Sequence, residues 1–158
     1  HFMDRHLFSK INIDRRNTHV PDGLAADKVT AGAEYDKMIQ AMGFTDLQLL
    51  GLGENGHIGF NEPGELVAGT HEVQLTKSTI EANARLFADI SEVPRTAITM
   101  GIWGIMTSRK VLLVACGEKK ADALRRALYG PVTAGVPASI LQLHRDLVVV
   151  CDQEAMQG

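Results

Sequence analysis

The segment from Gly51 to Pro63, which reads GLGENGHIGFNEP, constrains this chain more than any other part of the sequence. It follows an apolar run at 47–50 that we interpret as a strand buried on both faces, because the run does not alternate with polar residues. The segment combines four glycines with a histidine, acidic side chains and asparagines. In open α/β sheets, ligands bind beyond the carboxyl ends of the strands, where such a loop lies. We therefore expect the functional site in this loop.

Apolar runs alternate with helical patterns along the rest of the chain. Strands are expected at 46–51, 71–76, 96–101, 110–117 and 147–150. Helices are expected at 31–42, 78–87 and 118–129, with a short helix containing Trp103, Ile105 and Met106. This alternation predicts an α/β fold with a Rossmann-like, open, mostly parallel sheet and helices on both faces. We expect residues 1–158 to form a single domain, since no linker or repeat interrupts the pattern.

The composition excludes several classes of partner. The formal net charge is -3 and no basic run occurs, which argues against binding to nucleic acid or to an anionic membrane. No apolar segment reaches transmembrane length. Cys116 and Cys151 end two apolar runs, and we interpret both as buried free thiols. Free thiols suit a reducing compartment, so we expect a cytoplasmic protein.

Three common site types fit the loop poorly. Residues 51–56 match G-x-G-x-x-G, but a dinucleotide site needs a helix to open there, and Gly59 and Pro63 disfavour one. His57 and Glu62 are not spaced as a helical pair of zinc ligands, and no cysteine cluster accompanies them. No G-x-S-x-G nucleophile motif is present. We therefore expect neither a metal nor an organic cofactor.

Acid–base chemistry remains as the interpretation of the loop. Histidine carries protons near neutral pH, and Glu62 lies close enough along the chain to fold back and hold the ring of His57. Asn55 could fix the other side of the ring or bind a substrate hydroxyl. In the alternative interpretation, His57 only satisfies carbonyl groups of the loop.

The run at 51–63 strongly resembles the signature of the glucosamine-6-phosphate deaminase (isomerase) family. The resemblance continues, in order, through QLT at 74–76, NARLF at 83–87, VPRTAITMG at 93–101, GEKKA at 117–121 and PASILQLH at 137–144. It therefore covers essentially the whole chain. Members of this family convert glucosamine 6-phosphate to fructose 6-phosphate and ammonia without a metal or organic cofactor.

The resemblance implies roles for the matching positions of the loop. His57 matches the histidine that assists opening of the sugar ring, and Glu62 matches the carboxylate that orients and tunes it. Asn55 is expected to complete the hydrogen bonds of the histidine. We place Gly53 and Gly59 among the substrate-binding residues.

The resemblance also implies two cations for the substrate phosphate. Arg85 lies in a segment at about 70–95 that matches the mobile lid of the family, and Lys120 lies near the start of a helix. Charge-assisted donors suit a phosphate dianion, and a helix N-terminus favours an anion nearby. The partner implied is thus a small amino sugar phosphate.

The family places further catalytic parts before the point where this chain begins. These are an aspartate base, in an Asp-Glu-Tyr-like motif, and a phosphate loop rich in glycine and serine. Asp4, Asp14 and Asp22 do not have matching surroundings. The chain therefore resembles a member without its N-terminal portion, and we expect the activity from the complete protein.

The residues leave other functions open. A galactosamine-6-phosphate deaminase would share the loop, whereas a 6-phosphogluconolactonase usually lacks an acid at the position of Glu62. A sugar-phosphate sensor would keep Arg85 and Lys120 without needing His57 and Glu62 together. Hexameric members activated by an acetylated sugar phosphate carry basic residues just before the lid. Because 70–74 reads THEVQ, we predict no such activation, while a homo-oligomer stays compatible with the resemblance.

Overall fold

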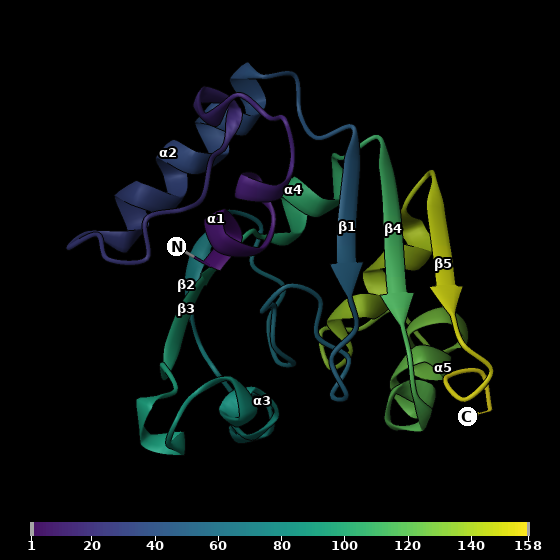
Figure 1. Ribbon diagram of the computed structural model, residues 1–158. Coiled ribbons are helices and arrows are strands. Elements are labelled where there is room, and N and C mark those ends of the chain that lie inside the picture. Colours follow the sequence, from purple (N-terminus) through teal and green to yellow (C-terminus); the bar gives the residue numbers. More distant parts are fainter. Residues whose placement is uncertain (1, 158) are drawn as a thin grey trace.

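The computed structural model describes residues 2–157 and contains a three-stranded parallel sheet (Figure 1). Its strands are β1 (Leu47–Gly51), β4 (Lys110–Ala115) and β5 (Leu147–Cys151), in the order β1-β4-β5. The register sets Leu50 beside Leu113. The predicted α/β fold, with a parallel sheet flanked by helices, is confirmed.

The remaining elements lie between and around these strands. They are α1 (Phe2–His6), η1 (Phe8–Lys10), η2 (Arg15–Asn17), α2 (Lys28–Ala41), β2 (His71–Gln74), α3 (Lys77–Asn83), η3 (Ala84–Leu86), η4 (Ile90–Glu92), β3 (Thr96–Thr99), α4 (Ile102–Met106), η5 (Glu118–Lys120), α5 (Ala121–Tyr129) and η6 (Pro137–Leu143), where η marks a 3-10 helix. None of the helices in residues 2–157 is long and apolar enough to cross a membrane.

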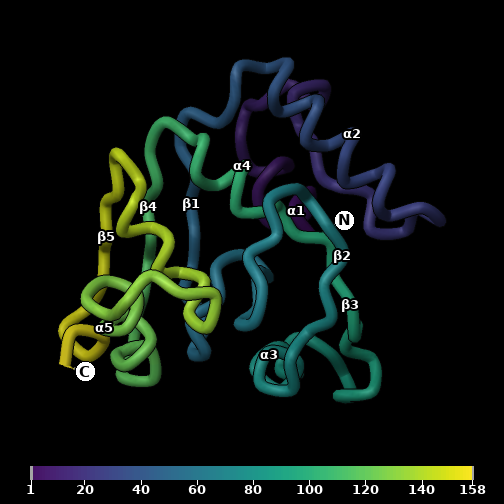
Figure 2. The backbone as a smooth tube through the Cα atoms, turned by 180° about the vertical axis from the view of Figure 1, so that it is seen from behind, coloured from purple at the N-terminus to yellow at the C-terminus, as the bar shows by residue number. Residues whose placement is uncertain are grey.

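The main core lies on the face of the sheet that α5 and η6 cover, as the view from behind shows (Figure 2). Val111, Leu113 and Ala115 alternate along β4 and are buried on this face. Leu124 of α5 packs against them in the same cluster. Burial of such side chains stabilises a fold by about 1.5–3 kcal/mol each, so this face holds the strands in register.

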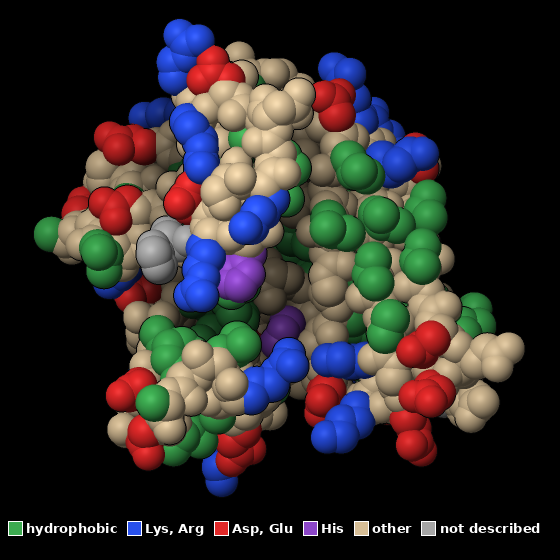
Figure 3. Space-filling model, viewed as in Figure 1, with side chains coloured by type: hydrophobic (Ala, Val, Ile, Leu, Met, Phe, Trp, Pro, Cys, Tyr) green, Lys and Arg blue, Asp and Glu red, His purple; other side chains and the backbone are tan. Residues whose placement is uncertain are grey.

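The opposite face of the sheet is open. Leu47 and Leu49 of β1 are 53% and 63% exposed, and Val148 and Val150 of β5 are also exposed. These side chains contribute to the hydrophobic surface over the sheet in Figure 3. The prediction that the strand at 46–51 is buried on both faces is therefore wrong for the described chain. Leu47 and Leu49 alternate with Gln48 and Leu50, so the strand has one exposed face and one covered face.

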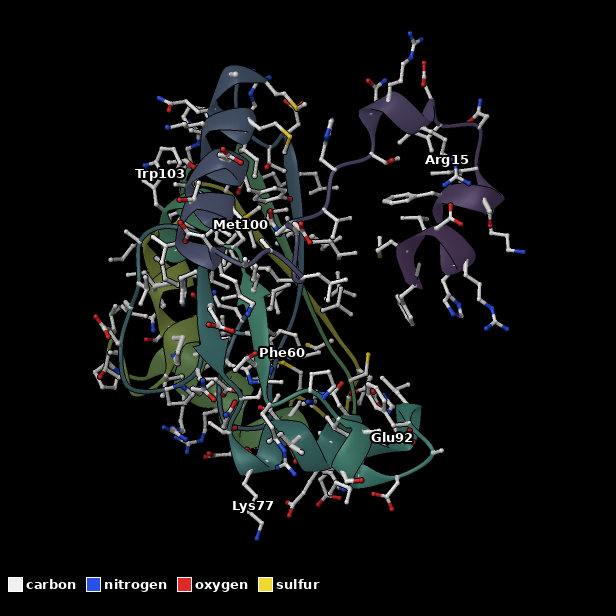
Figure 4. The ribbon with its side chains drawn as sticks, turned by 90° about the vertical axis from the view of Figure 1, so that its left-hand side faces the viewer. Arg15, Phe60, Lys77, Glu92, Met100 and Trp103 are labelled. Carbon is white, nitrogen blue, oxygen red and sulfur yellow. The ribbon has the colours of Figure 1, made fainter. Side chains whose placement is uncertain are left out.

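Residues 70–95, which were predicted to be the lid and are called the lid below, stand beside the parallel sheet. Its strand β2 pairs antiparallel with β3, so the strands predicted at 71–76 and 96–101 pair with each other and do not join the parallel sheet. Asp36 of α2 anchors the start of the lid by accepting hydrogen bonds from the Thr70 N–H and hydroxyl, at 2.7 and 2.5 Å. Figure 4 shows Lys77 and Glu92 at the outer end of the lid, with Lys77 pointing away from the body.

Two smaller predictions have mixed outcomes. Gly43 has φ 84 just after the C-cap of α2, as expected for a glycine that ends a helix. The interpretation of both cysteines as buried is wrong for Cys116, which is exposed just past β4, whereas Cys151 is partly buried. The apolar run before Cys116 ends in the sheet, and the thiol lies beyond it.

Candidate active site

The loop after β1 folds into a compact turn. The Gly53 N–H donates to the His57 carbonyl at 2.9 Å, and Ile58 forms isolated bridges to both Leu52 and Asn61. Ile58 is completely buried, which anchors the loop to the core. The described residues 52–64 contain no helix, so the loop lacks the helix that a dinucleotide fingerprint requires.

Gly53 allows the ring of His57 to lie against the backbone. A Cβ atom at this position would approach three ring atoms of His57 to 2.6 Å, which is closer than carbon atoms can pack. The glycine is thus needed here for space and not for an unusual backbone angle. This contact places the imidazole at the carboxyl end of β1.

Glu62 holds His57 from the far end of the loop. Its Oε2 lies 3.3 Å from His57 Nδ1 and accepts a 2.7 Å hydrogen bond from Asn55 Nδ2. Asn55 Oδ1 in turn accepts from the backbone N–H of His57 at 3.2 Å. Asn55 therefore fixes Glu62 and the backbone of His57, and it does not bind the other side of the ring. An ionised carboxylate only accepts, so the proton of a neutral His57 lies on Nδ1 and Nε2 is left as an acceptor.

The second carboxylate oxygen of Glu62 binds the lid. Oε1 accepts a 2.6 Å hydrogen bond from the Thr79 hydroxyl, and the Thr76 hydroxyl lies 3.3 Å away. The sequence pattern did not predict either contact, and α3 begins one residue before the predicted helix at 78–87. The N-cap is Thr76, whose hydroxyl accepts from the Thr79 N–H. Thr76 and Thr79 are three residues apart at the start of a helix, which places them on the same side of it. This spacing was the signal that could have indicated a common partner.

Burial and hydrogen bonding set the pKa values of the pair. Burial by itself would raise the pKa of Glu62, but hydrogen bonds from Thr79 and Asn55 and the nearby His57 lower it overall. Burial is the main cause that lowers the pKa of His57, with the charge of Lys120 adding to it, against the opposing effect of Glu62. The pair at neutral pH is therefore a neutral imidazole beside an ionised carboxylate.

One cavity of about 420 Å³ gathers the predicted site residues. Six of the seven line it: Gly53, Asn55, His57, Gly59, Arg85 and Lys120. The seventh, Glu62, is 8% exposed and contacts His57 from the interior of the protein. Figure 3 shows a hollow at this end of the sheet with Lys and Arg side chains on both sides of it. The structure brings these residues together, and their roles stay predictions.

The cavity has two walls. Lys120 is the N-cap residue of α5 and belongs to the sheet side, whereas Arg85 follows α3 in the lid. Gly59 has φ 59, and Phe60, which follows it and is labelled in Figure 4, is partly buried and lines the same cavity. Among residues 2–157, no group of three or more His, Cys, Asp or Glu side chains could hold a metal ion.

A family model described as glucosamine-6-phosphate isomerases/6-phosphogluconolactonase matches residues 1–150. The chain belongs to this family. The glucosamine-6-phosphate deaminase of Lachnoclostridium phytofermentans is 59% identical over 152 residues, which are 96% of this chain and 64% of the relative. The enzyme of the same name from Clostridium perfringens strain 13 is 53% identical over 156 residues, which are 98% of this chain and 64% of the relative.

A solved structure described as a monomeric glucosamine-6-phosphate deaminase superposes with a TM-score of 0.94 at 42% identity. The match covers 98% of this chain and 64% of that one. The 6-phosphogluconolactonase of Thermotoga maritima superposes with a TM-score of 0.66 at 19% identity, which shows a shared fold only. The chain thus spans 64% of the length of the Lachnoclostridium and Clostridium relatives.

Proposed function

We propose that the complete protein containing this chain deaminates and isomerises glucosamine 6-phosphate to fructose 6-phosphate and ammonia. The observation that carries the proposal is the His57–Glu62 pair at the edge of a cavity that also receives Arg85 and Lys120. A base poised near neutral pH and two cations fit a substrate with an exchangeable proton and a phosphate. The relatives that carry this name support the same assignment.

His57 would open the sugar ring in this reaction. Nε2 of the neutral imidazole takes the proton of the hydroxyl on the first sugar carbon, the bond from that carbon to the ring oxygen breaks, and the proton returns to the ring oxygen. The imidazole carries a positive charge between the two transfers, and the Glu62 carboxylate at 3.3 Å stabilises it. Asn55 keeps Glu62 in place without adding a second negative charge.

Arg85 and Lys120 would hold the phosphate from opposite walls of the cavity. Arginine binds phosphate through two parallel N–H donors, which gives orientation as well as affinity. Lys120 adds a compact charge at the start of α5, where the helix dipole also favours an anion. Binding of the phosphate at one end of the sugar would place the first sugar carbon, at the other end, near His57.

The test is ammonia release from glucosamine 6-phosphate by the complete protein, compared with its His57→Ala and Glu62→Ala variants. Loss of a general acid–base group costs on the order of a hundredfold to ten-thousandfold in turnover. Unchanged turnover in both variants would refute the catalytic roles. Galactosamine 6-phosphate and 6-phosphogluconolactone serve as rival substrates, and binding of sugar phosphates without turnover of any of them would support a sensor instead.

We further propose that the enzyme is a cytoplasmic monomer. The free thiols of Cys116 and Cys151 support a reducing compartment, and the solved relative at 42% identity is described as monomeric. Light scattering of the complete protein at working concentration checks the assembly. A mass of two or more chains would contradict it.

A further inference from the structure

The hydroxyl of Thr79 stands at the centre of the polar cluster beneath the cavity. Its Oγ1 lies 2.6 Å from Glu62 Oε1, 3.0 Å from the Thr76 hydroxyl and 3.4 Å from His57 Nδ1. A hydroxyl has one proton to donate, and the shortest of these distances assigns it to the carboxylate. Thr79 is 3% exposed, so water does not replace this bond when it is lost.

Thr79 also determines which way the carboxylate of Glu62 is turned. The two threonines are donors to Oε1, while Asn55 and His57 are donors to Oε2. A carboxylate bound at one oxygen only can rotate about its last torsion, since that torsion is broad. With Thr79 in place, Oε2 is kept facing the ring of His57.

The same residue connects the phosphate side of the cavity to this pair. Thr79 lies in α3, and its carbonyl accepts a 2.8 Å hydrogen bond from Asn83 Nδ2 at the end of that helix. Arg85 follows directly in η3 and lines the cavity. Arg85 is therefore presented by η3, which continues directly from the helix that holds Glu62.

We propose, resting on the proposed function, that Thr79 is a positioning residue that fixes the Glu62 carboxylate against His57 when the lid helix is seated. Although Thr79 lines the cavity, its hydroxyl proton is donated to Glu62, so in this role it donates no hydrogen bond to the sugar or its phosphate. It acts through Glu62, and its effect belongs to turnover more than to substrate binding. A purely structural threonine would contribute only packing and the local turn at the start of α3.

The matched variants are Thr79→Val, which keeps the branched shape and removes the hydroxyl, and Thr79→Ser, which keeps the hydroxyl. We expect Thr79→Val to lower kcat for ammonia release by about ten- to hundredfold, the range for a buried hydrogen bond to a charged group. KM should stay within about twofold, and Thr79→Ser should recover most of kcat. Thr107→Val, which removes a partly buried hydroxyl contact to the Trp103 carbonyl and does not alter the cavity lining, is the control and should leave kcat unchanged.

The pH dependence of kcat distinguishes the positioning role from a purely structural one, because a loss of packing alone would not change the pKa of Glu62. The hydrogen bond from Thr79 is the largest of the effects that lower the pKa of Glu62, so Thr79→Val should raise that pKa. The acid limb of the kcat profile should then shift to higher pH. Carbon-13 titration of the Glu62 carboxyl measures the shift without turnover. If the wild-type protein releases no ammonia, the proposed function fails, and the titration alone still decides whether Thr79 holds Glu62. A Thr79→Val protein with wild-type kcat and an unshifted Glu62 titration overturns the inference.

Discussion

The two walls of the cavity are held in different ways. The sheet side, with His57 and Lys120, rests on a core in which Ile58 and Leu113 are completely buried and Leu124 is 2% exposed. The lid side lies outside this core: Ile80 and Val93 are buried but do not belong to the main core cluster, and η3 with Arg85 contains no buried residue. The lid instead contacts the site through threonine hydroxyls on Glu62. Apolar packing therefore fixes His57, the predicted proton carrier, whereas the lid lies outside the main core and reaches the site through polar contacts.

Gly53→Ala breaks the sheet side most directly. The added Cβ would overlap the His57 ring, so the ring must move away from Glu62. We expect kcat for ammonia release to fall by about a hundredfold or more, as for loss of an acid–base group. Gly135→Ala is the matched control, because its Cβ would meet only ordinary contacts. Full turnover in Gly53→Ala would show that the ring position does not matter.

Truncation of one core residue on each side sharpens the contrast in stability. Leu113→Ala in the sheet should lower the free energy of unfolding by about 2–5 kcal/mol, the usual cost of such a cavity. Ile80→Ala in the lid should cost less, since weakly packed segments open locally before the whole fold is lost. Urea unfolding of both variants measures the difference. An equal or larger loss for Ile80→Ala would place the lid within the main cooperative unit.

Substitution of Arg85 and of Lys120 distinguishes two effects: the binding of the substrate phosphate and the change in the pKa of His57. Lys120→Met and Arg85→Met should each lower kcat/KM by about tenfold or more, because each removes a charge-assisted bond. Burial and the charge of Lys120 both lower the pKa of His57, so Lys120→Met alone should raise that pKa and move the acid limb of the kcat profile to higher pH. Equal shifts in both variants would contradict this assignment.

The smallest expected effect concerns activation. Glu72 in the segment before α3 pairs with Lys28 of α2 at 3.0 Å, and the segment 70–74 has no lysine or arginine. We expect an acetylated sugar phosphate to leave the kinetics of the complete protein unchanged. Initial rates over a range of substrate concentration, with and without this compound, measure it. Clear activation would mean that cations outside this segment bind the compound.

The sequence predicted the sheet side better than the lid. The apolar run that contains Val111, Leu113 and Ala115 predicted both the existence and the bounds of a strand. The glycine-rich loop was expected to form the site because it follows the carboxyl end of the neighbouring strand. Local patterns carried this information, because each strand is recognised from its own residues. The exposure of Leu49 could not be predicted in this way, since an apolar run does not show which face is covered.

The contacts between distant segments were beyond the sequence pattern. Glu62 could be expected near His57, which is five residues away, but its bonds to Thr79 depend on where the lid folds back. The pairing of β2 with β3 sets that position, and no motif in either strand announced it. Residues that act across two elements are therefore the part of a site that reasoning along the chain misses.

Nitrogen-15 NMR titration of His57 in the complete protein tests the central claim most directly, namely that burial keeps this residue a neutral base while Glu62 holds its proton on Nδ1. We expect the neutral imidazole at pH 7 with its proton on Nδ1 and a pKa below the ordinary value of about 6.5. The base would then lose its proton-accepting form only as the pH falls through that lowered pKa. A His57 pKa above the ordinary value, or a neutral ring with its proton on Nε2, would contradict the account.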